Sequence, residues 1–93
     1  MKIEIKKFGE LLVSRPDGRE AYLILEANHL KDLSKNELIE IDFNGVKAIT
    51  PGWADEVVTK LAERFENVKL LNTENATVQA TLITLREFSD LKI

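Results

Sequence analysis

Residues 38–53 read LIEIDFNGVKAITPGW and combine a strand, a turn and a helix start. Leu38–Phe43 has an apolar body, which is typical of a strand in the middle of a sheet. Asn44-Gly45 is a strong turn signal. Thr50-Pro51 then predicts the start of a helix, with threonine as the N-cap and proline at the first helical position. A strand that leads directly into a helix favours an α/β fold.

The helix that begins at Pro51 has apolar residues at every fourth position, which predicts one face buried against a sheet. On this face lie Trp53, Val57, Leu61 and Phe65. Val68–Leu71 follows as a second buried strand. Asn72 or Thr73 then caps a third helix, whose inner face includes Val78 and Leu82.

The N-terminal part predicts two further strands. Met1–Lys6 alternates apolar and charged residues, as a half-buried strand does, and Leu11–Val13 is a second short strand. Because Gly9 allows a tight turn, we expect these two strands to form a hairpin. Residues 19–33 favour a helix, since the apolar pattern continues past strand length. A hairpin after the Pro-Asp-Gly turn is the alternative.

The predicted element order is β-β-α-β-α-β-α over a single domain, residues 1–93. The fold class is therefore α/β, with a mixed four-stranded sheet packed against about three helices. A chain of 93 residues leaves no room for a second core.

Composition limits the function. The net charge is −3, so the chain as a whole does not attract nucleic acid or an anionic membrane. The absence of cysteine excludes disulfides and thiolate chemistry, and a single histidine excludes sites that need two. Neither a signal peptide nor a membrane-length apolar run is visible, and we expect a cytoplasmic protein.

The run from Ile41 to Val46, followed by Ile49-Thr50 and by Trp53-Ala54-Asp55-Glu56, resembles the STAS-like domains of unknown function found in bacteria and phages. Their usual pattern is a strand ending Asp-Phe-x-Gly-Val and a helix opening Ser-Phe-Ala-Asp-Glu. Upstream, the run from Leu12 to Arg15 and then Gly18 also resemble that family. The likeness covers residues 11–65 and implies a small STAS-like α/β domain.

The wider STAS superfamily includes the anti-sigma factor antagonists, and the resemblance implies a regulatory partner such as a histidine-kinase-like ATPase. It also implies a serine at the helix start that the partner phosphorylates. Phosphate would add about two negative charges beside the free N–H groups of a helix end. This chain has Gly52 where relatives have that serine. We expect the switch to be lost, with Thr50 as an N-cap; Thr50 as a relocated phosphosite is the alternative.

The expected partner-binding surface surrounds the helix start. Its residues are Thr50, Gly52, Trp53, Asp55 and Glu56, with Asn44 in the preceding turn. For Trp53, packing against the sheet and anchoring a partner both stay open. We expect no metal site, because Asp55 and Glu56 point about 100° apart on a helix and do not both face Asp42.

Arg15 and Arg19 flank a glycine, and two guanidinium groups could hold a phosphate or a carboxylate. An ordinary surface turn is the alternative, because no P-loop supports the anion site. His29 has no serine or cysteine partner, so general-base chemistry is not supported, and we expect it at the surface.

The sequence therefore predicts a non-catalytic regulatory domain that binds another protein and needs no cofactor. The alternative is a domain that binds a nucleotide or phosphate near the helix start. An enzyme is the least favoured class, because no nucleophile–base pair can be identified.

Overall fold

The computed structural model describes residues 1–93 and confirms the α/β architecture. The strands form two sheets, and every strand pair is parallel. The main sheet has the order β1–β3–β5, with β1 at Lys2–Glu4, β3 at Leu38–Asp42 and β5 at Asn67–Leu71. The second sheet pairs β2 (Leu11–Leu12) with β4 (Ala48–Ile49).

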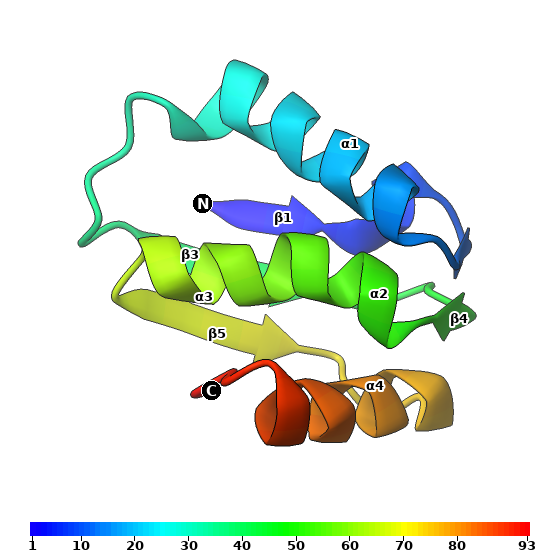
Figure 1. Ribbon diagram of the computed structural model, residues 1–93. Coiled ribbons are helices and arrows are strands. Elements are labelled where there is room, and N and C mark those ends of the chain that lie inside the picture. Colours follow the sequence, from blue (N-terminus) through cyan, green and yellow to red (C-terminus); the bar gives the residue numbers. More distant parts are fainter.

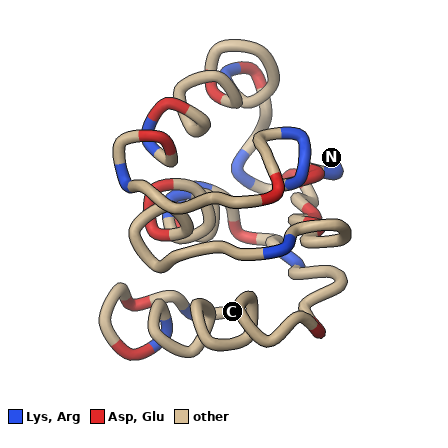
Figure 2. Tube along the Cα trace, turned by 90° about the vertical axis from the view of Figure 1, so that its right-hand side faces the viewer, with Lys and Arg blue, Asp and Glu red and all other residues tan.

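The helices lie on one side of the main sheet, as Figures 1 and 2 show. α1 (Arg15–Leu25) continues into the π-helical turn η2 (Glu26–Leu30). One continuous helical stretch consists of α2 (Pro51–Ala54), the π-helical turn η3 (Asp55–Thr59) and α3 (Lys60–Arg64). The remaining elements are the short 3₁₀ helix η1 (Ile5–Phe8) and α4 (Ala76–Phe88). None of these helices has the length and apolar character needed to cross a membrane.

The pattern of the strands explains why only one face of the main sheet is covered. Ile3 pairs with Ile41, and both side chains are buried toward the helices. On the other face the register places Lys2, Glu40 and Lys69 side by side on the three strands. Opposite charges on neighbouring strands attract one another and stabilise the strand pairing, so this face can remain exposed to solvent.

The predicted four-stranded mixed sheet and the predicted hairpin are both wrong. β1 pairs with β3 and β2 pairs with β4, so the first two strands lie in different sheets. Instead of a tight turn, η1 follows β1 and buries Ile5 in the core. Gly9, with φ at +132°, then leads the chain into β2. Ala48–Ile49, expected only to re-enter the core, becomes a strand because β2 offers it an edge.

The prediction of a helix over residues 19–33 is confirmed for residues 19–30: the helix begins earlier than expected, at Arg15, and ends at Leu30. Its N-cap is Ser14, whose hydroxyl accepts a hydrogen bond from the backbone N–H of Asp17 at 3.1 Å. Pro16 occupies the first turn, where its missing N–H costs nothing. The helical pattern buries Ala21 and leaves neighbouring side chains exposed.

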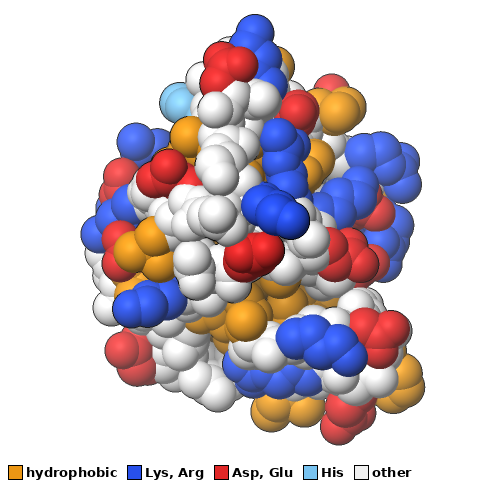
Figure 3. Space-filling model, turned by 90° about the vertical axis from the view of Figure 1, so that its left-hand side faces the viewer, with side chains coloured by type: hydrophobic (Ala, Val, Ile, Leu, Met, Phe, Trp, Pro, Cys, Tyr) orange, Lys and Arg blue, Asp and Glu red, His pale blue; other side chains and the backbone are white.

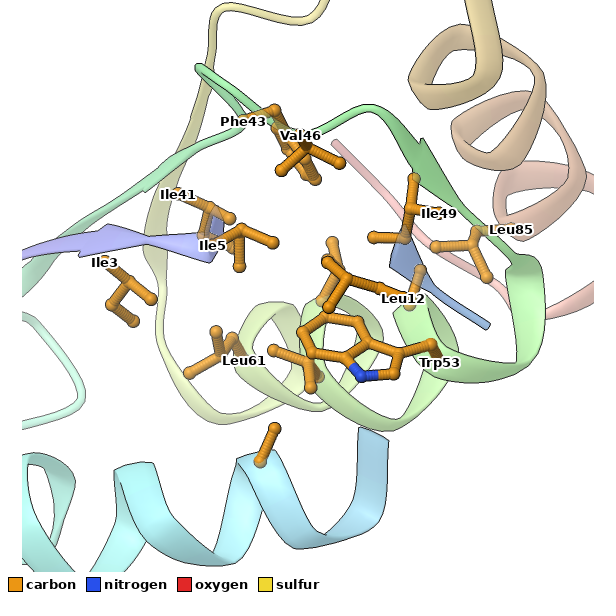
Figure 4. Packing of buried hydrophobic residues seen from close by; sticks show 14 of the residues in the cluster. Ile3, Ile5, Leu12, Ile41, Phe43, Val46, Ile49, Trp53, Leu61 and Leu85 are labelled. Atoms are coloured by element: carbon orange, nitrogen blue, oxygen red, sulfur yellow. The ribbon is translucent and has the colours of Figure 1, made fainter. Parts of the chain in front are cut away.

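The core lies between the main sheet and the helices, and the ring of Trp53 is among its largest buried side chains (Figure 4). α4 is joined to the second sheet through threonines. The buried Thr81 hydroxyl donates to the carbonyl of Ile49 at 2.6 Å, and the Thr77 hydroxyl donates to that of Lys47 at 3.2 Å. These contacts fix β4, and with it the chain that enters α2.

Candidate partner-binding site

The parallel strands bring several loops and helix starts to one end of the molecule, on the right in Figure 1. There the chain leaves β3 through the exposed turn Asn44–Gly45, and Gly45 has φ at +84°. α1, α2 and α4 all begin at this end. The fold therefore brings Asn44, Thr50 and Gly52 to the same end, as the sequence predicted, and we call this the carboxyl end.

Thr50 occupies the N-cap position, but its side chain makes no capping hydrogen bond. Instead, the hydroxyl donates to the carbonyl of Leu12 at 3.4 Å, and the Thr50 backbone N–H donates to the same oxygen at 3.0 Å. The expectation of a side-chain cap is therefore wrong. The half-buried hydroxyl is directed toward β2, which makes it a poor position for a phosphosite.

The residues that follow form the accessible part of the helix start. Pro51 is exposed and Gly52 is half-buried. A β-carbon placed on Gly52 would lie 3.5 Å from the β-carbon of Arg15, which is an ordinary contact distance. Position 52 therefore has room for a small side chain, and a glycine is not required there by packing.

Trp53 is only 1 % exposed and packs inside the fold. Its ring lies 6.0 Å from that of Phe8, centroid to centroid, at an interplanar angle of 56°. Such a tilted arrangement is favourable for aromatic pairs. The structure therefore places Trp53 in the core rather than on an exposed surface, and the ring is not free to anchor a partner.

Arg15 connects α1 to the second helix through two carboxylates. One guanidinium nitrogen, Nη1, donates to Asp55 Oδ2 and to Glu56 Oε2, each at 2.8 Å. The other carboxylate oxygen of Glu56, Oε1, accepts a hydrogen bond from Lys60 Nζ at 2.7 Å. Arg19 Nε lies 3.7 Å from the same Oε1 atom. These five residues form what we call the ion-pair cluster.

The ion-pair cluster shifts the titration of its carboxylates. Hydrogen bonds from Lys60 and then Arg15 lower the pKa of Glu56. Burial acts to raise the pKa of Asp55, but hydrogen bonds and charge from Arg15 and further hydrogen bonds outweigh it, so the net shift is downward. Asp55 and Glu56 in turn raise the pKa of Arg15. The groups hold one another in their charged forms, so the cations predicted for an external anion bind carboxylates of their own chain.

Asp42 lies apart from the ion-pair cluster and has a structural role. Its Oδ1 accepts from Asn72 Nδ2 at 2.7 Å and from the backbone N–H of Asn44 at 2.9 Å. Lys2 Nζ lies 3.3 Å from Oδ2. Hydrogen bonds from Asn72 and then Asn44 lower the pKa of Asp42. The chain contains no group of three or more acidic or histidine side chains arranged to hold a metal ion.

The sequence did not predict that apolar side chains would be exposed at the carboxyl end. Leu11 is 68 % exposed and Val13 is 61 % exposed, while Leu12 between them is buried. The sequence feature that could have indicated this exposure is the run of three apolar residues at Leu11–Val13, because a short strand does not bury all of its side chains. At the opposite end of the molecule, positive and negative side chains are interspersed around the exposed His29, as Figure 3 shows.

A family model described as a STAS-like domain of unknown function matches residues 25–79. The match spans more than half of the chain and includes β3, the Asn44–Gly45 turn and the whole of α2. No curated protein and no solved structure gives a significant match.

Proposed function

We propose that this chain, which belongs to the family of STAS-like domains of unknown function, is a non-catalytic regulatory domain that binds another protein. The proposed contact surface is the start of α2 at Thr50, Pro51 and Gly52, with the turn at Asn44 beside it. Sheets of parallel strands bind ligands at their carboxyl ends, which supports this location. The proposed place of action is the cytoplasm.

The single observation that carries the proposal is the exposure of apolar side chains beside this helix start. Leu11 and Val13 extend from β2 and its continuation, and Thr50 is hydrogen-bonded to the residue between them. Two large apolar side chains left exposed two residues apart, next to a helix start, favour a protein-binding surface there. The alternative, a nucleotide or phosphate ligand, has less support because the Arg15 guanidinium already binds two carboxylates.

The residues of the predicted surface divide into two roles. Thr50 and Gly52 are partly accessible and are proposed to meet the partner, with Asp55 at the edge of that contact. Trp53 and Glu56 are buried and are proposed to support the surface from within. The family resemblance favours a histidine-kinase-like ATPase as partner. Because Gly52 has no hydroxyl, binding would be insensitive to phosphorylation at that position.

Affinity capture from the cells that produce the protein, read by quantitative mass spectrometry, tests the proposal. We expect the wild type to retain a specific protein that Gly52→Asp loses, because a new charge would lie within the contact. Ala27→Asp places the same charge on an exposed position of η2 and should retain it. Thermal melts of all three proteins would verify their folding. Equal capture by Gly52→Asp and the wild type would contradict the proposed surface.

A further inference from the structure

An apolar groove of about 220 Å³ opens between α1 and the segment that contains η1 and β2. Its floor is formed by Leu12, Ala21 and Trp53, all buried, and Figure 4 shows the Leu12 side chain beside the Trp53 ring. Its rim includes Leu11 and Ile24, which are 68 % and 52 % exposed. Pockets for small molecules typically measure about 300–1,000 Å³, so this groove suits one bulky side chain better than a cofactor.

Two carboxylates line the same groove and have no counter-charge. Asp17 and Glu20 are exposed, and neither forms an ion pair within the chain. They stand three residues apart on α1, a spacing that places side chains next to each other. The groove therefore combines an apolar floor with unpaired negative charge at its rim.

The two faces of α1 differ in their charge. Its cations Arg15 and Arg19 lie against Glu56, at 2.8 and 3.7 Å, on the side of the helix that meets α2 and η3. Arg15 and Arg19 are therefore paired with Glu56 in the ion-pair cluster, and they do not neutralise Asp17 and Glu20. A ligand that complements the groove must supply both an apolar side chain and a positive charge.

We propose that this groove docks a short segment of the partner protein that carries a bulky apolar residue next to a lysine or arginine. The apolar side chain fills the groove above its buried floor and packs against the exposed Leu11 and Ile24 at the rim. The cation pairs with Asp17 and Glu20. This inference rests on the proposed function and adds a second contact at the carboxyl end, with a stated chemistry for the partner.

Selection of short random peptides displayed on phage, with the wild-type domain as bait, tests the inference. We expect the enriched peptides to share an apolar residue beside Lys or Arg. Synthetic versions without tryptophan can be titrated by fluorescence, because Trp53 is the sole tryptophan and lies on the groove floor. Occupation of the groove should change its emission.

Matched variants locate the bound peptide. Ile24→Asp should weaken binding at least tenfold, whereas Leu23→Asp, on the adjacent exposed position outside the groove, should leave it unchanged. The double variant Asp17→Asn with Glu20→Gln should weaken binding severalfold and reduce its dependence on salt. All four changed side chains are exposed, so the variants should fold.

Four outcomes would overturn the proposed docking of a partner segment. Three come from the peptide experiments: failure to enrich any peptide, equal loss of binding in Ile24→Asp and Leu23→Asp, and enrichment of acidic instead of basic peptides. A wild-type dimer that Ile24→Asp dissociates would assign the groove to a second copy of this chain and also overturn the proposal. The capture experiment with Gly52→Asp decides the proposed function separately, because it probes the start of α2 rather than the groove.

Discussion

Gly18 of α1 lies directly against the backbone of Trp53 in α2. A β-carbon built on Gly18 would lie 2.6 Å from the Trp53 carbonyl oxygen and 2.9 Å from its α-carbon. Neither atom can move without displacing the helix backbone. The glycine therefore sets how closely α1 approaches the second helix, and this approach allows Arg15 to reach Asp55 and Glu56.

We predict that Gly18→Ala destabilises the fold, although alanine is the better helix former. Overpacking of this kind costs about 1–3 kcal/mol, which exceeds the gain of about 1 kcal/mol in helix propensity. Urea unfolding followed by circular dichroism measures the difference. The matched control is Gly52→Ala, whose new β-carbon meets Arg15 at 3.5 Å and should leave stability unchanged or slightly raised. Equal stabilities for the two variants would show that the contact at Gly18 does not constrain the helices.

The buried Glu56 is expected to contribute more to stability than other acidic residues of its helix. Glu56→Gln removes the charge that Arg15, Arg19 and Lys60 share, and should lower the free energy of unfolding by about 1–2 kcal/mol. The loss stays moderate because the three cations are partly exposed and regain water. Glu63→Gln, at an exposed position without an ion pair, should change stability by less than about 0.5 kcal/mol. Urea midpoints that coincide for both variants would rule out this role.

Acid should destabilise the protein through the same carboxylate. The pKa of Glu56 lies below its ordinary value of 4.5, so the unfolded chain binds this proton at higher pH than the folded one. The contribution is therefore complete above about pH 4.5 and is lost as the pH falls through the lowered pKa. Denaturation midpoints measured between neutral pH and pH 3 should fall in the wild type and fall less steeply in Glu56→Gln. If the midpoints of the wild type and Glu56→Gln fell equally with pH, Glu56 would have the same pKa in the folded and unfolded protein, and the prediction would be wrong.

Local signals in the sequence predicted much of this fold. The strand predicted over Leu38–Phe43, the turn Asn44–Gly45 and the helix start at Pro51 each depend on neighbouring residues. The structure contains all three, with the strand ending one residue earlier, at Asp42. Strand pairing depends on residues far apart in the chain. Nothing in Met1–Lys6 indicates that this segment pairs with β3. The hairpin was predicted because Leu11–Val13 is the next strand along the chain, and that prediction is wrong.

The candidate site was predicted less completely, for the same reason. Asp55 and Glu56 were expected at the helix surface, yet their partner Arg15 stands 40 and 41 residues away in sequence. Helical periodicity placed Trp53 on the buried face but could not decide whether its ring also reached a partner. The groove beside it requires α1 to lie across β2, which no local pattern of residues 11–24 specifies.

The single tryptophan makes the burial of the helix start directly measurable. Because Trp53 is 1 % exposed, its emission should be blue-shifted, and iodide should quench it weakly in the folded protein and strongly in urea. Trp53→Ala should lower the free energy of unfolding by about 3–5 kcal/mol, as loss of a large buried aromatic does. Trp53→Phe should cost less, since a phenyl ring can still pack against Phe8. Strong iodide quenching in the native state would instead place the ring at the surface. It would then restore Trp53 as a residue available to contact a partner, because the quencher and a binding protein require the same access to the indole.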